Sequence, residues 1–416
     1  MLTGIGVDFC YLNDNSLRQN SDRLERASEP HFDRDRAFAI AGSTSMKSSV
    51  DLLVVGAGFA GAVLAERFAR VLGKRCLVID RRPHIAGNAY DGFDAAGVLI
   101  HHYGPHYFRT NSDRVRIYLS QFTDWRPVDY TILSYSNGRF WNFPINLNTF
   151  EQFVGHSATS EEMLTTLAKW RSPVEKPRNS EEVIISQVGY ELYEKFFRNY
   201  TRKQWQRDPS ELDSSVCGRI PIRTNRDNRY LTEKFQALPK DGYTTLIERI
   251  IDHPKIEVQL QTQFHELKVS FRHLIFTGPI DEYFSRRFGP LPYRSLRFEP
   301  ETLAMRYFQP AVQVNYPNNY EFTRIVEMKH ITGQQLPVTT IVREYPVDFG
   351  PGKEHYYPIP APDAKALYLR YAELAAAQKN VSFVGRLANY RYYNMDQVIA
   401  TALAEFDRLA GLDRSR

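Results

Sequence analysis

The stretch Asp51–Val55, DLLVV, runs directly into GAGFAG at Gly56–Gly61, and this junction decides the fold. The apolar run predicts a buried parallel strand, and the glycines have the G-x-G-x-x-G spacing. Residues 62–72 then continue as a helix, and residues 75–79 form the next strand, which ends in Asp80, 24 positions after Gly56. Together these segments predict a complete strand–turn–helix–strand unit that binds a dinucleotide. An isolated glycine turn, the alternative, would not need the second strand or its terminal carboxylate.

Each glycine of this unit, and the aspartate at its end, has a physical task. Gly56 permits the tight turn, Gly58 lets the backbone approach a pyrophosphate, and Gly61 lets the helix pack closely on the strand. The helix N-terminus offers unpaired N–H groups to phosphates, and Asp80 can accept hydrogen bonds from ribose hydroxyls. The unit alone does not separate NAD from FAD. A basic, glycine-containing stretch just beyond Asp80 and a late strand that runs into Gly385 and Arg386 favour FAD.

The rest of the chain changes character twice. Residues 151–212 are predicted to be mainly helical, and residues 290–350 have the alternation typical of an antiparallel sheet. Residues 381–384, VSFV, then return as a strand, and residues 395–409 are predicted to be a closing helix. Because the dinucleotide-binding part opens the chain and is completed at its end, the middle is expected to be inserted into it.

Composition narrows the class of protein. The chain has 416 residues, of which 43% are hydrophobic and 24% charged, as in globular proteins of two or three domains. Its net charge of +5 without a dense basic block argues against a nucleic-acid partner. No apolar run predicts a membrane span. Three cysteines (Cys10, Cys76 and Cys217), far apart and without metal-like spacing, suit a cytoplasmic protein.

Residues 1–48 are polar and charge-mixed, without a persistent amphipathic period. We expect them to form a disordered N-terminal extension, or to precede a true start at Met46. No signal peptide is predicted there.

Eight motifs, in register from about residue 50 to the end of the chain, resemble those of the bacterial UDP-galactopyranose mutases. They are IDRRPHIAGNAYD (79–91), HHYGPHYFRTN (101–111), NYTRKQW (199–205), GRIPIR (218–223), DNRY (227–230), FTRIVEMKH (322–330), HYYPIP (355–360) and GRLANYRYYNMDQV (385–398). The resemblance implies a mixed α/β fold with a Rossmann-like FAD-binding domain, an inserted helical domain and a six-stranded antiparallel sheet.

Mapped onto this chain, the resemblance implies three domains. The FAD-binding domain would be discontinuous, with residues 50–124, about 241–289 and 358–416. The helical insert would span about residues 149–212. The antiparallel-sheet substrate domain would take about residues 125–148, 213–240 and 290–357. A homo-oligomer is compatible with this arrangement, and the sequence leaves the oligomeric state open.

The activity implied is the interconversion of UDP-galactopyranose and UDP-galactofuranose with no net redox change. In the family the reduced flavin is thought to attack the anomeric carbon through N5 and to expel UDP. Such chemistry needs a flavin, a diphosphate cradle and exclusion of water rather than many protein acids and bases. The sequence carries no G-x-S-x-G or H-E-x-x-H motif.

The family's site residues can be carried over by motif. Cofactor binding is implied for Gly56, Gly58, Gly61, Asp80, Arg82, Gly87, Asn88, Gly385, Arg386 and Met395. Substrate binding is implied for Phe196, Tyr200, Thr201, Trp205, Arg219, Tyr230, Arg324, Tyr357, Tyr392 and Asn394. Arg219, Arg324 and His106 are the expected catalytic residues, the two arginines as donors to the diphosphate. No metal is expected, because His101, His102 and His106 lack a matching carboxylate.

Four positions depart from the family pattern. Arg109 and Asp396 replace histidines, Asn394 replaces an aspartate, and Tyr130 replaces a sugar-contacting asparagine. These departures concern the sugar and the flavin rather than UDP. Two other functions fit parts of the sequence: an FAD-dependent oxidase of the amine-oxidase type, and a catalytically silent UDP-sugar-binding protein. Neither oxidase chemistry nor an apolar substrate cage explains the paired arginines.

Overall fold

Strand β1 (Ser49–Val55) lies at the centre of a five-stranded parallel sheet with the order β10-β2-β1-β11-β17. The computed structural model describes residues 49–411 of the chain. The other strands of this sheet are β2 (Cys76–Ile79), β10 (Ile256–Gln259), β11 (Ser270–Phe276) and β17 (Val381–Phe383). Strand β17 pairs with β11 in parallel, so the end of the chain completes the sheet that its beginning opens. The predicted late strand is therefore confirmed.

Helix α2 (Phe59–Leu72) covers one face of this sheet, together with α14 (Met395–Leu409) and α10 (Tyr243–Ile251). The alanines of α2, together with Val63 and Leu64, are buried in one core with Val54 and Ile275 of the sheet, and α2 ends at Gly73 with φ +63°. The opposite face buries Leu53 and Phe276 under Phe264 and Tyr283. A sheet covered on both faces explains why DLLVV is apolar without alternation.

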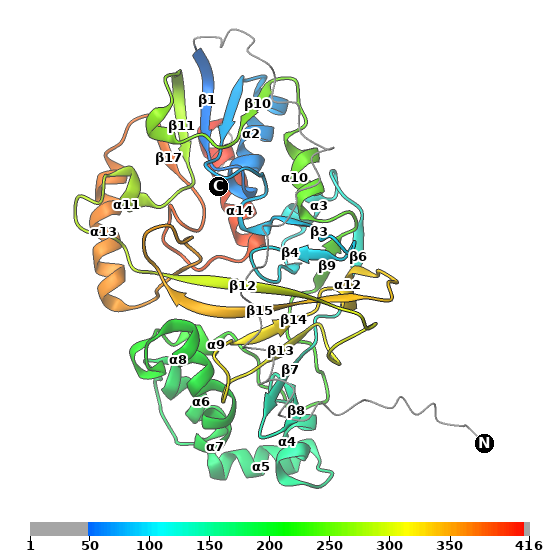
Figure 1. The fold of residues 1–416 in the computed structure, drawn as a ribbon. Coiled ribbons are helices and arrows are strands. Elements are labelled where there is room, and N and C mark those ends of the chain that lie inside the picture. Colours follow the sequence, from blue (N-terminus) through cyan, green and yellow to red (C-terminus); the bar gives the residue numbers. More distant parts are fainter. Residues whose placement is uncertain (1–48, 412–416) are drawn as a thin grey trace. The chain divides into compact units, whose positions relative to one another are not determined.

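A seven-stranded sheet forms the second layer of the molecule, with the order β16-β12-β15-β14-β13-β7-β8. Its long strands β12 and β15 run side by side (Figure 1). The strands are β7 (Ile132–Ser136), β8 (Arg139–Phe143), β12 (Tyr293–Leu303), β13 (Gln313–Asn315), β14 (Arg324–Val326), β15 (Thr339–Asp348) and β16 (Tyr357–Pro358).

The expectation of six antiparallel strands is wrong in two respects. There are seven strands, and β13 pairs with β7 in parallel. The short β16 adds the seventh strand by pairing with Tyr293 and Arg294. The remaining pairs are antiparallel, as the alternation over residues 290–350 predicts.

Helices follow β8, as predicted for residues 151–212, and a loop with Pro173 and Pro177 interrupts them. They are α4 (Leu147–Val154), α5 (Ser160–Trp170), α6 (Ser180–Val188), α7 (Tyr190–Tyr193), the π-helical η3 (Glu194–Arg198), α8 (Asn199–Trp205), η4 (Pro209–Glu211) and α9 (Ser215–Gly218). Their apolar side chains share one core with β7, β8 and β14. This core fixes the helices against the edge of the seven-stranded sheet.

Smaller elements link these layers. Strand β9 (Phe235–Pro239) pairs with both β5 (Phe108–Thr110) and β6 (Trp125–Pro127), and β3 (Asp91–Phe93) pairs with β4 (Leu99–His101). The remaining helices are η2 (Gly87–Ala89), α3 (Asp113–Leu119), η5 (Phe264–Glu266), α11 (Ile280–Tyr283), α12 (Lys329–Thr332) and α13 (Pro362–Ala376). The division into three domains stays a prediction, and β9 joins segments assigned to two of them.

The predicted extension over residues 1–48 lies outside the described residues. Among residues 49–411, no helix is both long and apolar enough to cross a membrane.

Candidate active site

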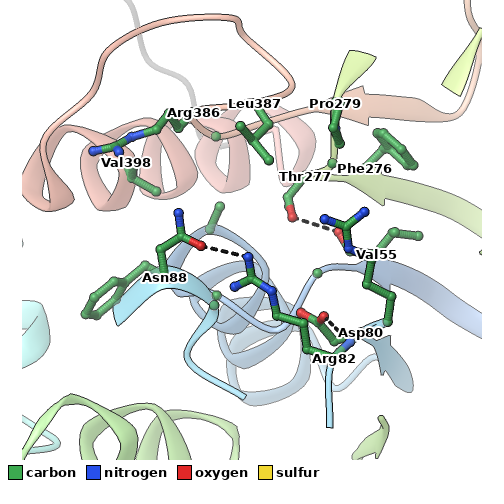
Figure 2. A pocket seen from close by; sticks show the side chains of 18 of the residues that line it. Val55, Asp80, Arg82, Asn88, Phe276, Thr277, Pro279, Arg386, Leu387 and Val398 are labelled. Carbon is green, nitrogen blue, oxygen red and sulfur yellow. Dashed lines mark hydrogen bonds between the residues drawn. The ribbon is translucent and has the colours of Figure 1, made fainter. Parts of the chain in front are cut away.

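A cavity of about 280 Å³ opens at the carboxyl ends of the parallel strands β1, β2 and β11. Figure 2 shows Asp80, Arg82 and Asn88 on one side of it and Arg386, Leu387 and Val398 on the other. The two sides come from opposite ends of the chain. In open α/β sheets this edge is where ligands bind.

The glycine turn makes room for a ligand through its backbone. A Cβ atom on Gly61 would lie 1.9 Å from the carbonyl oxygen of Gly56, so any side chain there would push α2 off β1. Gly56 has φ +107°, and a Cβ on it would lie 2.0 Å from Oγ1 of Thr277. A Cβ atom on Gly87 would lie 3.2 Å from Cα of Gly58, so the two glycines let two backbone turns run close together on the cavity wall. Gly61 itself does not line the cavity, consistent with its predicted packing task.

The N-terminus of α2 faces this cavity. Its N-cap, Gly58, supplies no side-chain acceptor to the first turn, and Gly58, Phe59 and Ala60 all line the cavity. Such uncapped amides and the helix dipole suit a phosphate. Asp80 is held by the amides of Ala57 (2.9 Å) and Arg82 (3.0 Å), which orient its carboxylate at the end of β2. Glycine backbone, helix terminus and carboxylate thus fit a dinucleotide.

A second cavity of about 240 Å³ lies next to the first, with Asn88, His106, Arg386 and Met395 lining both. Its walls come from the seven-stranded sheet, from η3 and α8, and from the loops that precede β5, β9 and α14. A ligand in the second cavity can therefore reach a ligand in the first.

Three of the four arginines that line the second cavity gather around Tyr392. Arg219 donates to the Tyr392 hydroxyl (3.3 Å) and lies 4.5 Å from the centre of that ring, while the Arg386 guanidinium lies 5.3 Å from it. Arg324 is tied to Glu344 through two hydrogen bonds of 2.9 and 2.7 Å. Within residues 49–411, Arg219 and Arg386 have no carboxylate partner. Two uncompensated cations beside a paired one form a site for an anion.

The pKa values of the two tyrosines here move in opposite directions. Burial raises the pKa of Tyr357. Burial acts on Tyr392 in the same sense, but the guanidiniums of Arg219, Arg386 and Arg324 outweigh it and lower the pKa of its hydroxyl. The three guanidiniums thus create a positive potential at the Tyr392 hydroxyl.

Aromatic side chains line the part of the second cavity formed by the helices. The π-helical η3 turns Phe196 and Phe197 inward, and Tyr200 and Thr201 follow on α8. Trp205 closes this wall against Tyr357 and Tyr392, with ring centres 5.8 Å from each. Flat apolar surface with a few hydroxyls suits a nucleobase and its ribose.

His106 stands between the two cavities. Its Nδ1 donates to the Gly104 carbonyl (2.8 Å), and burial lowers the pKa of the imidazole to about 3. The ring is therefore neutral at physiological pH and leaves Nε2 as an acceptor. His101 is a core residue instead, accepting from the His106 amide (3.0 Å) near Asp91. Among the described residues, no group of three or more His, Cys, Asp or Glu could hold a metal ion.

Comparison with known proteins adds two matches to family profiles and several relatives. Residues 195–392 match UDP-galactopyranose mutase, and residues 54–122 match an NAD(P)-binding Rossmann-like domain. A probable UDP-galactopyranose mutase of Klebsiella pneumoniae is 39% identical over 86% of this chain and 94% of its own length. The chain belongs to the UDP-galactopyranose mutase family. Members of this family are isomerases, and membership implies a flavin in the Rossmann-like domain.

The chain is also similar to a second mutase and to two solved structures. A dTDP-fucopyranose mutase of Escherichia coli is 32% identical over 85% of this chain and 96% of its own length. The crystal structure of a reduced UDP-galactopyranose mutase superposes with a TM-score of 0.71 at 18% identity, covering 88% of this chain and 94% of that one. A redesigned putrescine oxidase has a TM-score of 0.57 at 14% identity, over 87% of this chain and 99% of that one. The fold is thus shared with this putrescine oxidase.

The structure places the residues carried over from the family in two groups. The positions expected to bind the cofactor line the first cavity, with the exception of Gly61. The positions expected to bind substrate all line the second cavity, including Tyr230 and Asn394. Their individual roles stay predictions.

Arg109, Asn394 and Tyr130, three of the four departures from the family pattern, line the second cavity, and the carboxyl of Asp396 lies next to Thr110 and interacts electrostatically with Arg109. Arg109 donates to Asn394 (3.0 Å), and both line the second cavity. Tyr130 is buried, stacks on Tyr107 with ring centres 3.4 Å apart and donates to Gln313. Asp396 lies in the first turn of α14, where burial raises the pKa of its carboxyl.

Several lining residues were missed in the sequence. Gln313 and Asn315 of β13 join through an amide hydrogen bond of 2.8 Å, and Glu233 pairs with Arg109. The period-two spacing of Gln313 and Asn315 around a buried Val314 is a signal that could have identified the first two. Glu233 has no local signal.

Proposed function

We propose that this chain holds FAD in the first cavity and interconverts UDP-galactopyranose and UDP-galactofuranose in the second. The observation that carries the proposal is the contact between the cavities. Uncompensated Arg219 and Arg386 lie beside an aromatic wall, and Arg386 and Met395 also line the Rossmann-like cavity. A nucleotide diphosphate on the arginines would hold its sugar within reach of a cofactor.

The chain's own residues supply binding and orientation. Phe196 and Tyr200 would stack on uracil, and Arg219 and Arg324 would hold the diphosphate, with hydroxyl donors from Tyr357 and Tyr392. Since charge builds up on the diphosphate as it leaves the sugar, these donors would stabilise departure as well as binding. Neutral His106 would accept a hydrogen bond at the junction of the two cavities.

FAD, when bound in its reduced form, would supply the electron pair at N5 that attacks the anomeric carbon. The Gly58–Gly87 approach and the uncapped start of α2 support pyrophosphate binding, and Asp80 supports ribose binding. The buried thiols Cys76 and Cys217, unpaired in the described chain, support a reducing cytoplasmic setting.

The test compares the two redox states of the purified protein. Anaerobic incubation with UDP-galactofuranose, with and without dithionite, is followed by chromatographic separation of the UDP-sugars. We expect the reduced protein to form UDP-galactopyranose over many turnovers per reducing equivalent, and the oxidised protein to bind UDP without turnover. Full activity of the oxidised protein would overturn the redox part, and a colourless protein would overturn the cofactor.

The same experiment separates the alternatives. An amine-oxidase-type enzyme would release hydrogen peroxide from an amine, and a silent binding protein would bind UDP and give no product in either redox state. Because a relative is named a dTDP-fucopyranose mutase, dTDP-fucopyranose belongs in the substrate panel.

A further inference from the structure

His106, which lines both cavities, is held through its backbone as well as its ring. Nδ1 of His101 accepts from the His106 amide at 3.0 Å, and the Tyr243 hydroxyl donates to the His106 carbonyl at 3.3 Å. Since Nδ1 of His106 itself donates to the Gly104 carbonyl, three polar atoms of this residue have partners. The imidazole at the junction of the two cavities therefore has little freedom to turn.

Asp91 joins the two residues that hold this backbone. Its Oδ2 accepts from the Tyr243 amide at 2.7 Å, and its Oδ1 accepts from the Thr244 amide at 2.8 Å. These amides open α10, whose N-cap, Gly242, has no side chain with which to accept from them. On its other side Asp91 faces His101, whose Nε2 lies 3.9 Å from Oδ2. Asp91 thus fixes the start of the helix that carries Tyr243 and lies beside the His101 ring.

A small cavity of about 20 Å³ is lined by Asp91, His101 and Tyr243. A separation of 3.9 Å is too long for a hydrogen bond, but a cavity of this size suits one bridging water molecule. Burial lowers the pKa of His101 to about 3, so its ring is neutral. Because its Nδ1 accepts from the His106 amide, the proton of the neutral ring is on Nε2, which faces Asp91. Asp91 therefore favours the tautomer of His101 that the His106 amide requires.

The three residues of this network lie behind the reaction site. Asp91, His101 and Tyr243 are all buried, and none of them lines either large cavity. Buried polar groups cost free energy unless they are paired, so packing alone would be served better by apolar side chains. The hydrogen bonds of His101 and Tyr243 are instead directed at one residue, His106.

We propose that His101 and Tyr243, both anchored on Asp91, are positioning residues that fix His106 between the two cavities for the reaction. The proposal rests on the proposed function for what His106 faces, a flavin on one side and a sugar on the other. Groups that take part in a reaction must be held within about half an ångström of their productive positions. Loss of either contact should therefore slow the reaction without affecting the arginines that hold the diphosphate.

The first measurement needs no turnover. The ring ¹⁵N signals of histidine-labelled protein distinguish the two tautomers of a neutral imidazole. We expect the Nε2–H tautomer for His101 and the Nδ1–H tautomer for His106, each assigned by its loss in His101→Gln or His106→Gln. An Nδ1–H tautomer of His101 cannot accept from the His106 amide and would overturn the proposal.

Two variants then show whether the network acts on His106. Tyr243→Phe removes the donor to the His106 carbonyl, and Asp91→Asn removes an acceptor beside His101 and α10, so each should change the His106 signals. The control is Tyr118→Phe, which removes the hydroxyl of a similarly buried ring that lines neither large cavity. Unchanged His106 signals in Tyr243→Phe would contradict the proposal, and this variant decides alone if Asp91→Asn fails to fold.

The second measurement separates position from binding. We expect Tyr243→Phe to lower kcat of the reduced protein with UDP-galactofuranose roughly two- to ten-fold, the effect of one lost hydrogen bond, at an unchanged Kd for UDP. Tyr118→Phe should change neither value. An unchanged kcat, or equal losses of kcat and UDP affinity, would show that Tyr243 serves folding only. A wild type without turnover would overturn the proposed function alone, because the histidine signals still decide whether the network fixes His106.

Discussion

At the residue scale, Arg219 and Arg324 differ in what already compensates their charge. Arg324 forms two hydrogen bonds with Glu344, which is fully buried, whereas Arg219 donates to the Tyr392 hydroxyl and packs on its ring, with no carboxylate partner among residues 49–411. Removal of Arg219 should therefore affect ligand binding alone. Removal of Arg324 also leaves a buried carboxylate without its partner.

We predict that Arg219→Ala and Arg324→Ala each lower kcat/KM at least ten-fold, since a charged hydrogen bond contributes about 1.5–3 kcal/mol. Only Arg324→Ala should also lower the free energy of unfolding, by about 3–5 kcal/mol, because one partner of a buried ion pair is lost. Steady-state kinetics and urea unfolding measure the two effects. Equal stability of the two variants would mean that Glu344 finds water or another donor.

Single residues also show where prediction from the sequence stops. Gly56, Gly58 and Asp80 were predictable because their tasks follow from spacing within one local unit. The pairing of Arg109 with Glu233 was not, because 124 positions separate the two and only the pairing of β5 with β9 brings them together. Charge compensation, which separates Arg109 from Arg219, is a property of the folded chain.

At the scale of elements, two glycines of the turn after β1 have different tasks: Gly61 is needed for folding and Gly58 for cofactor binding. A Cβ on Gly61 would overlap the Gly56 carbonyl at 1.9 Å, whereas a Cβ on Gly58 would meet its nearest atom, Cα of Gly87, at 3.7 Å. We predict that Gly61→Ala prevents folding and that Gly58→Val yields folded, colourless protein, because valine fills the space for the pyrophosphate. Circular dichroism and the flavin absorbance measure these outcomes. Gly350→Ala, in open space, is the control, and a yellow Gly58→Val protein would contradict the prediction.

Helix α8 is tied to the β13–β14 connection by one half-buried lysine. Lys203 donates to the carbonyls of Tyr316, Tyr320 and Phe322, and burial lowers its pKa to about 8. This connection leads to Arg324, so Lys203 links the aromatic wall to a diphosphate arginine.

We predict that Lys203→Met lowers the free energy of unfolding by about 1–3 kcal/mol, because carbonyl groups lose a charged donor. It should also weaken UDP binding, since Tyr200 and Arg324 are no longer held at a fixed separation. Calorimetric titration with UDP and urea unfolding provide the two measurements, with exposed Lys379→Met as the control. Unchanged UDP affinity in a destabilised variant would show that the link serves folding only.

At the scale of the whole molecule, the parallel sheet was more predictable than the mixed one. Strands β1 and β2 and helix α2 form one local unit, and α14 begins and ends at the predicted residues. The parallel pair β13–β7 joins segments about 180 residues apart in sequence, from Gln313 to Ile132, and alternation does not reveal strand direction. The two-residue β16 has too little pattern to be recognised.

The last prediction concerns three histidines whose pKa values all lie far below that of a free imidazole, the buried His101 and His355 and the half-buried His106. Burial lowers the pKa of His101, His106 and His355 to about 3 each. In the unfolded chain each would take up a proton near pH 6.5. Between pH 6.5 and 3 the unfolded state therefore binds more protons than the folded state, and the folded state loses stability as the pH falls.

Each such histidine should lower the free energy of unfolding by about 1.4 kcal/mol per pH unit below 6.5. The three together should lower it by about 4 kcal/mol per pH unit. Urea unfolding between pH 7.5 and 5 measures this slope. His101→Gln removes one proton from the balance, so its slope should be shallower by about 1.4 kcal/mol per pH unit, whatever its stability at pH 7.5. An identical slope in wild type and variant would mean that His101 is already protonated in the folded protein. That result would contradict its acceptor role toward the His106 amide, and with it the neutral imidazole proposed between the two cavities.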